Sequence, residues 1–158
     1  MRDMPGQIQR LTLPHVQVRP AARSWVWVLS LVVGLTAATA GADFEAAADA
    51  YRRQDYVSAY AQFEPLALAG DPRAQTVIAL MFKYGESVKP NYQTAFNWYL
   101  RAAEQGYAPA QFNVGVMLAE GQGLAPNREE GLVWLRKAAS NGYDGARGEL
   151  TRVGQSVG

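Results

Sequence analysis

The sequence predicts an all-α fold, an α-solenoid of about three helix-turn-helix repeats followed by a C-terminal capping helix. The first observation is a period of 36 residues, at which Gly70, Gly106 and Gly142 recur. Aligning residues 70–105 with 106–141 gives ten identities in 36 positions. The second observation is composition, because the residues after position 42 include 20 Ala but only 12 Ile, Val and Thr together. A fixed period of this length is typical of stacked helical units, and the scarcity of β-branched residues argues against a sheet.

The first unit is predicted over residues 43–69, as two helices with a short linker at Arg53–Gln54. Its first helix carries a row of apolar side chains at helical spacing: Phe44, Ala47, Ala48 and Tyr51. Asp55 is the predicted N-cap of the second helix, which runs to about residue 69, because an aspartate side chain can accept from the free amides of a first turn.

The second and third units, 70–105 and 106–141, are predicted to contain two longer helices each. In residues 72–84, Ala74, Ile78 and Met81 fall on one face, and in 92–104 the same spacing brings together Ala95, Trp98, Tyr99 and Ala102. The repeat spacing of Trp98, Tyr99 and Trp134 favours a role in packing between helices over a ligand-stacking box.

The same two units show start and stop signals for each helix. Asp71, Asn91 and Asn127 stand where N-caps belong. Gly85 and Gly121 are predicted to end the first helices, since a helix commonly stops at a left-handed residue. Gly70, Gly106 and Gly142 are predicted to end the second helices in the same way. In the linkers that follow the first helices, Val88 and Leu124 are expected to fill the space under the loop.

Residues 142–153 are predicted to form a capping helix with Ala146 on its inner face, because a stacked array must cover its last exposed side. The repeat domain thus spans 43–153, and residues 154–158 are predicted to be a disordered tail. We expect this domain to be monomeric.

Residues 1–42 are predicted to be an export signal. Four Arg precede an uncharged apolar run from Trp25 to Leu35, and small residues follow it. Cleavage is expected after Ala40 or after Ala42, and translation starting at Met4 or later also fits. The alternative is an uncleaved inner-membrane anchor over residues 24–42, a stretch without charge. After cleavage, no membrane insertion is expected, so the predicted location is periplasmic, with secretion as an alternative.

Two stretches carry a family resemblance. Residues 110–118 and 121–124 match a first-helix signature of the type A-x-Y-N-L-G-x-M-Y followed by G-x-G-V, and 95–106 match a second helix ending in A-A-E-x-G. Over roughly 55–148 the chain resembles the Sel1-like repeats, relatives of the tetratricopeptide repeats. Val77, Ser87 and Gly131 depart from the pattern, and Gly131 is expected to loosen its helix by up to ~1 kcal/mol relative to Ala. The resemblance implies a superhelix whose concave side holds a peptide or another protein, and exported members are similar to periplasmic scaffolds.

Charge and chemistry exclude several classes of function. After residue 42 the chain has 11 Lys and Arg against 13 Asp and Glu, so a nucleic-acid footprint is not expected. It also has neither His nor Cys there, which argues against His relays, thiol nucleophiles and zinc sites. The loop at Gly121–Gly123 follows a helix rather than a strand, and Glu129 and Glu130 suit the first turn of a helix better than an acid pair. We therefore predict no catalytic, cofactor-binding or metal-binding residues.

Partner binding is predicted on a second stripe of the first helices, beside the core stripe. Its members recur at the repeat period on two helices, as mixed polar and apolar side chains: Arg73, Val77, Leu80, Tyr84, Asn113, Val116 and Glu120. Such a stripe is how solenoids build a concave surface. The alternative is that these residues pack against the neighbouring unit.

The predicted function is therefore non-enzymatic: an interaction scaffold or adaptor of the bacterial cell envelope that binds another protein or an extended peptide. One alternative is an envelope hydrolase of the β-lactamase-like Sel1 type. The Cys pairs that those members carry are absent from this chain, so catalysis there would rest on carboxylates alone. Another alternative is a secreted, host-directed factor, which shares the same fold and differs only in destination.

Overall fold

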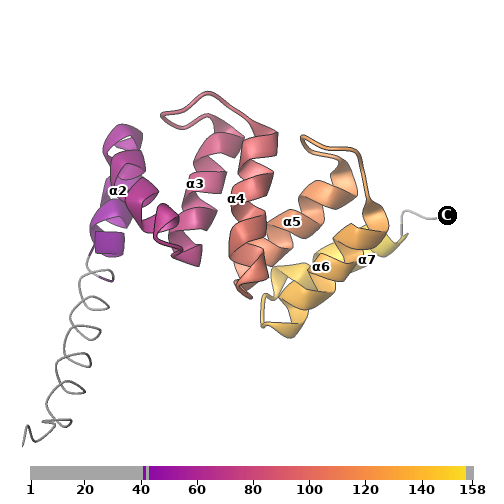
Figure 1. The fold of residues 1–158 in the computed structure, drawn as a ribbon. Coiled ribbons are helices and arrows are strands. Elements are labelled where there is room, and N and C mark those ends of the chain that lie inside the picture. Colours follow the sequence, from indigo (N-terminus) through magenta and orange to yellow (C-terminus); the bar gives the residue numbers. More distant parts are fainter. Residues whose placement is uncertain (1–40, 42, 156–158) are drawn as a thin grey trace, which may run out of the picture. The chain divides into compact units, whose positions relative to one another are not determined.

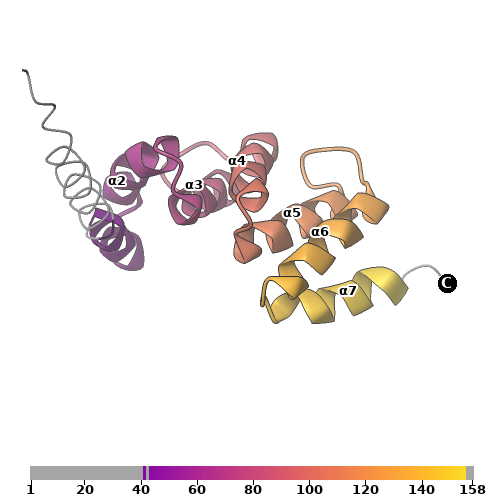
Figure 2. The ribbon, with the colours of Figure 1, turned by 60° about the horizontal axis from the view of Figure 1, so that its bottom comes forward.

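The computed structural model describes residue 41 and residues 43–155, and all regular elements in that part of the chain are helices. A helical segment at 43–52 is followed in order by six helices: α2 (Tyr56–Leu68), α3 (Pro72–Tyr84), α4 (Tyr92–Glu104), α5 (Ala108–Glu120), α6 (Arg128–Ser140) and α7 (Gly145–Gln155). From α2 onwards each helix packs against the next one along the chain (Figures 1 and 2), and α5 also contacts α3 and α7. The predicted all-α solenoid is confirmed. The predicted export signal lies outside the described residues, Gly41 apart.

The helices begin where the sequence places N-caps. The side chains of Asp55, Asp71, Asn91 and Asn127 each accept from a backbone N–H of the first turn. At α6 the bond is reciprocated, because the Asn127 amide donates to the Glu130 carboxylate at 2.9 Å. Helix α5 has Tyr107 as its N-cap residue, makes no side-chain capping bond, and has a proline in its first turn. Local chemistry therefore sets four of these starts.

The ends of the first helices in the second and third units are also set by nearby residues. Gly85 and Gly121 adopt φ of 76° and 73°, and their N–H groups donate to the carbonyls of Met81 and Met117. Two residues later, Gly123 has φ 77° while Ser87, at the equivalent position, has φ 65°. Ser87 thus holds a left-handed conformation that glycine adopts at lower cost.

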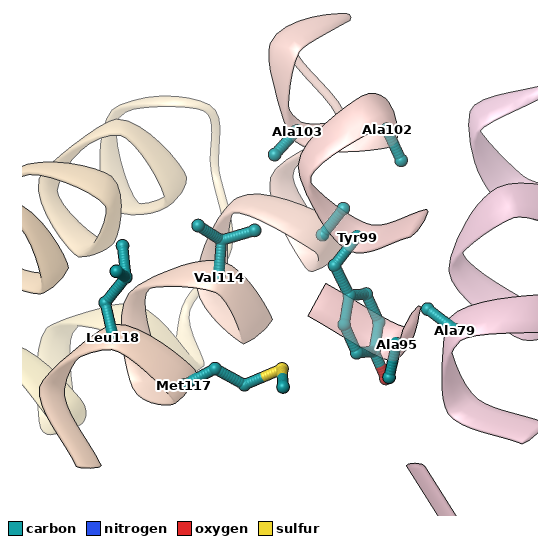
Figure 3. Packing of buried hydrophobic residues seen from close by; sticks show 9 residues of the cluster. Ala79, Ala95, Tyr99, Ala102, Ala103, Val114, Met117 and Leu118 are labelled. Atoms are coloured by element: carbon teal, nitrogen blue, oxygen red, sulfur yellow. The ribbon is translucent and has the colours of Figure 1, made fainter. Parts of the chain in front are cut away.

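The core is built from two clusters of buried side chains, one from residues 43–52, α2 and α3 and the other from α3, α4 and α5. The row predicted for residues 72–84 is buried, as are Ala95, Tyr99 and Ala102 of α4. Val88 and Leu124 are half-buried and pack against these clusters, as expected of residues under the loops. Figure 3 shows the ring of Tyr99 among side chains of α3, α4 and α5.

Gly131 has a packing role that the sequence did not predict. It does not simply loosen α6, because a Cβ there would lie 2.7 Å from the Gly115 carbonyl oxygen and 3.0 Å from the Ala119 nitrogen. A Cβ on Gly115 would in turn lie 2.7 Å from Cγ of Leu135. The two glycines occupy the positions of Ala79 and Ala95 in the preceding unit. They let the backbones of α5 and α6 approach more closely than alanine permits, which offsets the cost in helix propensity.

Helix α7 covers the last unit, with Ala146 and Val153 buried. It begins at Gly145 rather than 142 and continues to Gln155. Two of the five residues predicted for the tail are therefore helical, because Val153 anchors the last turn against the array. Residues 156–158 lie outside the described part.

Candidate functional site

The predicted binding stripe lies on α3 and α5, which contact each other. Arg73, Val77, Leu80 and Tyr84 come from α3, and Asn113, Val116 and Glu120 come from α5. The fold therefore places the two halves of the stripe on neighbouring first helices. How much of each side chain remains available for a partner differs along the stripe.

At the start of α3, Arg73 is engaged within the fold. Its guanidinium pairs with the Asp71 carboxylate at 2.7 Å and stacks over the Phe44 ring at 4.1 Å. The Asp71 hydrogen bond raises the pKa of Arg73, although burial opposes this. Val77 is half-buried against the core cluster of the first two units. These two side chains therefore pack α3 against the first unit, Arg73 through Phe44 of the helical segment at 43–52 and Val77 through the core.

On α5 the polar members of the stripe also have partners. Asn113 Nδ2 donates to the Pro109 carbonyl at 2.8 Å, one turn earlier on its own helix. Glu120 pairs with Arg152 of α7 at 2.6 Å. Leu80 and Val116 are half-buried. The α5 half of the stripe thus presents its residues as a rigid, partly packed surface.

Tyr84 differs from the rest of the stripe because its side chain is 62% exposed at the end of α3. The neighbouring Lys83 Nζ lies 5.6 Å from the centroid of the Tyr84 ring. Burial lowers the pKa of Lys83, while the negative charge of Glu120 acts in the opposite direction. An exposed aromatic ring on a rigid helix end is the kind of side chain that anchors a protein partner.

Glu86, in the loop after α3, interacts with two tyrosines of the first unit, Tyr51 and Tyr56, and sequence analysis did not find this contact. The Tyr51 hydroxyl donates to Glu86 Oε2 at 2.7 Å, across 35 residues of sequence. The rings of Tyr51 and Tyr56 meet edge to face, with centroids 5.3 Å apart. Burial and the hydrogen bond to Glu86 raise the pKa of Tyr51. Nothing in the sequence signals this contact, because it joins two different units.

Tyr99 completes this group from α4. Its side chain is fully buried, and its hydroxyl has no hydrogen-bond partner within the described residues. Burial raises the pKa of Tyr99, and the charges of Tyr84 and Glu86 act in the same direction. We call Tyr51, Tyr56, Tyr84, Glu86 and Tyr99 the tyrosine–glutamate cluster.

A second feature that sequence analysis missed is a repeated polar clamp between units. Gln75 and Gln111, 36 residues apart, are buried, and each Nε2 donates at 3.1 Å to a carbonyl at the end of the preceding helix, Ala67 or Ala103. Their Oε1 atoms accept from Gln105 at 2.9 Å and from Asn141 at 2.8 Å. The 36-residue spacing of the two glutamines is the signal that could have revealed this clamp.

The two tryptophans that the sequence assigned to the core are only half-buried. Arg101 lies over the Trp98 ring at 4.6 Å, and Lys137 Nζ lies over the Trp134 ring at 4.0 Å. The pairs occupy equivalent positions on α4 and α6. Each tryptophan packs against the core and is stacked by a cation, which is typical of an amphipathic side chain at a boundary.

The remaining chemistry of the described residues fits a structural role. Glu129 and Glu130 lie in the first turn of α6, where negative charge is favourable. A Cβ at Gly123 would meet Tyr92, so this loop packs against the start of α4. Residues 43–155 contain no group of three or more His, Cys, Asp and Glu side chains suited to a metal ion. Within the same residues, no helix is both long and apolar enough to cross a bilayer.

These features define a class of protein, the α-helical repeat arrays built from stacked helix pairs. The Sel1 repeat model matches the chain twice, at residues 72–107 and 108–143. Both matches begin two residues after the predicted units at 70 and 106, at the first residues of α3 and α5. The chain is a Sel1-like repeat protein.

Solved structures agree with this family. A Sel1 repeat protein from Oxalobacter formigenes is 33% identical with a TM-score of 0.65, over 68% of this chain and 44% of the other. The c5321 protein, a protective antigen of uropathogenic Escherichia coli with an SLR fold, is 26% identical with a TM-score of 0.67, over 72% of this chain and 25% of the other. The chain thus spans less than half the length of either.

A third structure, the cysteine-rich protein B of Helicobacter pylori, shares the fold with a TM-score of 0.57 at 14% identity. The match covers 71% of this chain and 95% of the Helicobacter pylori protein. No curated protein matches the sequence. Repeats of this family are typically scaffolds for protein–protein interaction and are generally not catalytic.

Proposed function

We propose that this protein is an exported adaptor of the cell envelope that binds a partner protein or an extended peptide along the stripe on α3 and α5. The observation that carries the proposal is Tyr84, an aromatic side chain that is 62% exposed on an otherwise ordered helix end. Because the helix fixes the backbone at this position, binding has to order only the Tyr84 side chain.

The stripe residues that already have partners within the fold, Arg73 and Glu120, are expected to shape the binding surface rather than to bind a partner alone. Arg73 and Glu120 are held by Asp71 and Arg152, so each presents a charge whose geometry is already set. Preorganised groups lose less entropy when a partner binds. The partner is therefore expected to lie across the ends of α3 and α5, near Tyr84 and Glu120.

Export is part of the proposal and rests on the sequence of residues 1–42. Mass spectrometry of the protein from its own cells is expected to find a chain that begins at Gly41 or Asp43. A chain that retains residues 24–42 would instead identify a membrane anchor. Fractionation into periplasm and medium separates the adaptor from the secreted, host-directed alternative.

The binding proposal is tested by affinity capture from the cell envelope followed by mass spectrometry. A stoichiometric, salt-stable partner is expected for the wild-type protein. The Tyr84→Ala variant, alone or with Asn113→Ala, is expected to lose at least about tenfold in affinity for it while helicity and melting stay unchanged. Val57→Ala is the matched control, since Val57 is 72% exposed on α2, away from the stripe.

Two results would contradict the proposal. If Tyr84→Ala binds the captured partner as tightly as Val57→Ala does, the stripe is not the binding surface. If the double variant unfolds, these residues belong to the core and the predicted surface does not exist.

A further inference from the structure

The tyrosine–glutamate cluster holds a carboxylate without a cation. Glu86 accepts from the Tyr51 hydroxyl at 2.7 Å, and it forms no ion pair with any Lys or Arg of residues 43–155. The other stripe carboxylate, Glu120, is paired with Arg152 at 2.6 Å. Glu86 is half-buried, so its charge is only partly solvated. A half-buried carboxylate that lacks a counter-ion favours the approach of a cation.

The side chains around Glu86 suit the same ligand. The ring centroids of Tyr51 and Tyr56 lie 5.3 Å apart. Tyr84 adds an exposed ring at the end of α3. Aromatic faces attract ammonium and guanidinium groups, and the attraction grows as the cation loses water. Carboxylate and rings together therefore recognise a cation with an apolar stem, as in a lysine or arginine side chain.

Tyr99 supplies an independent observation. Its ring is fully buried, and its hydroxyl has no partner among the described residues, although buried hydroxyls are nearly always hydrogen-bonded. The charge of Glu86 acts to raise the pKa of Tyr99, which supports including this hydroxyl in the cluster. An N–H of a cation bound beside Glu86 would donate to this hydroxyl oxygen and satisfy it.

We propose that Glu86 and the tyrosines around it receive a lysine or arginine side chain from a partner protein segment. Overall charge agrees, because the residues after position 42 carry 11 basic and 13 acidic groups. The inference rests on the proposed function, since the cluster shares Tyr84 with the binding stripe. It adds the chemistry of the partner, which is a basic residue placed where the segment passes the end of α3.

The test uses a displayed library of random peptides, selected on protein purified in the form in which it occurs in its cells. Wild-type protein is expected to select peptides with Lys or Arg at one fixed position. For the best arginine peptide, replacing that arginine by citrulline, which is neutral and of the same shape, is expected to weaken binding about tenfold or more.

Matched variants assign the effect to Glu86. Glu86→Gln keeps an oxygen that accepts from Tyr51, so the fold is retained, and it is expected to bind the arginine and citrulline peptides equally. Glu104→Gln, at the far end of α4, is expected to behave as wild type. Tyr99→Phe is expected to weaken the arginine peptide several-fold and to leave the citrulline peptide unchanged.

The outcomes separate this inference from the proposed function. Selected peptides without a required basic residue, or a Glu86→Gln variant that still prefers arginine, would overturn the cation site and leave peptide binding intact. A Tyr99→Phe variant that binds both peptides as wild type does would remove the buried hydroxyl from the site and overturn its proposed geometry. A library that yields no binder would contradict both the proposed function and the inference.

Discussion

The Tyr99 hydroxyl is buried at the cost of its hydrogen bonds to water, and the described residues offer no replacement. Desolvating a hydroxyl without a new partner is unfavourable, whereas the ring itself packs well within its cluster. The folded protein is therefore expected to be less stable with tyrosine at this position than with phenylalanine. Its presence agrees with the role in binding that we propose for it.

Replacing Tyr99 with Phe is expected to increase the free energy of unfolding by about 1–3 kcal/mol, because it removes the unpaired group and keeps the ring. Urea unfolding measures the change. Tyr51→Phe is the control and is expected to destabilise by about 1 kcal/mol, since it removes the bond to Glu86. Equal destabilisation by both variants would show that the Tyr99 hydroxyl is hydrogen-bonded in solution.

Asp71, the N-cap of α3, is expected to make the stability of the fold depend on pH. Burial acts to raise the pKa of Asp71, but hydrogen bonds from the Arg73 side chain and backbone outweigh this, and the pKa falls below 3.8 in the fold. A carboxyl group whose pKa is lowered by folding adds stability above its unfolded pKa, and this stability is lost as the pH falls through the folded pKa.

Asp71→Asn keeps the N-cap but loses the charge. Stability is therefore expected to fall less steeply for this variant than for wild type between about pH 5 and about pH 2. Thermal melts across this range measure the slopes. Asp144→Asn, which changes an exposed aspartate without an ion pair in the described residues, should retain the wild-type slope. Parallel slopes for wild type and Asp71→Asn would mean that the Asp71–Arg73 pair adds nothing to stability.

At the scale of helices, α5 and α6 pack through glycine where α3 and α4 pack through alanine. A helix with Gly131 in its interior is about 1 kcal/mol less favourable than one with Ala. We expect the close approach to outweigh this cost, because a Cβ on Gly131 would lie 2.7 Å from the Gly115 carbonyl oxygen. This helix pair therefore depends on tertiary contact more than its equivalent does.

Gly131→Ala and Gly115→Ala are each expected to destabilise by about 1–3 kcal/mol, as overpacking does, despite the gain in propensity. Gly148→Ala is the matched control, because it is also helical, and its Cβ meets nothing within 4 Å. That variant should gain about 0.5–1 kcal/mol. Calorimetry measures the stability of the three variants against wild type. Stabilisation by Gly131→Ala would show that α5 and α6 separate readily.

At the scale of the whole array, the glutamine clamps tie each unit to the next. Each clamp satisfies a carbonyl at one helix end and a side-chain amide from the following unit. At the next repeat position the chain has Arg147, which is exposed, so the series of clamps stops where α7 closes the array. In such arrays stability depends on the interfaces between neighbouring units.

Gln111→Met keeps the shape of the side chain and removes both hydrogen bonds of the clamp. We expect a loss of about 1–3 kcal/mol, because the Ala103 carbonyl and the Asn141 amide both lose a partner. Gln93→Met, on the exposed side of α4, should change stability by less than about 0.5 kcal/mol. Hydrogen exchange is expected to show faster opening of the units that Gln111 joins. Uniform protection across the array would contradict a local clamp.

The helices, the period and the class of the protein all follow from the amino-acid sequence. N-caps such as Asn91, left-handed stops such as Gly85 and rows such as Ala74–Ile78–Met81 act within one or two turns, so their effects follow from nearby residues. The repeat then implies the stacking, because one unit cannot bury its apolar face alone.

The packed structure was needed to show which of the surface side chains already have partners within the fold. It showed that Arg73 and Glu120 already have partners, that Gly131 is a contact rather than a weak point, and that Tyr51 meets Glu86. The contacts of Glu120, Gly131 and Tyr51 join different helices. Tyr51 and Glu86 are 35 positions apart in the sequence, and no local pattern relates them. Their geometry depends on how the helices pack, which the period implies in outline but not in the position of each side chain.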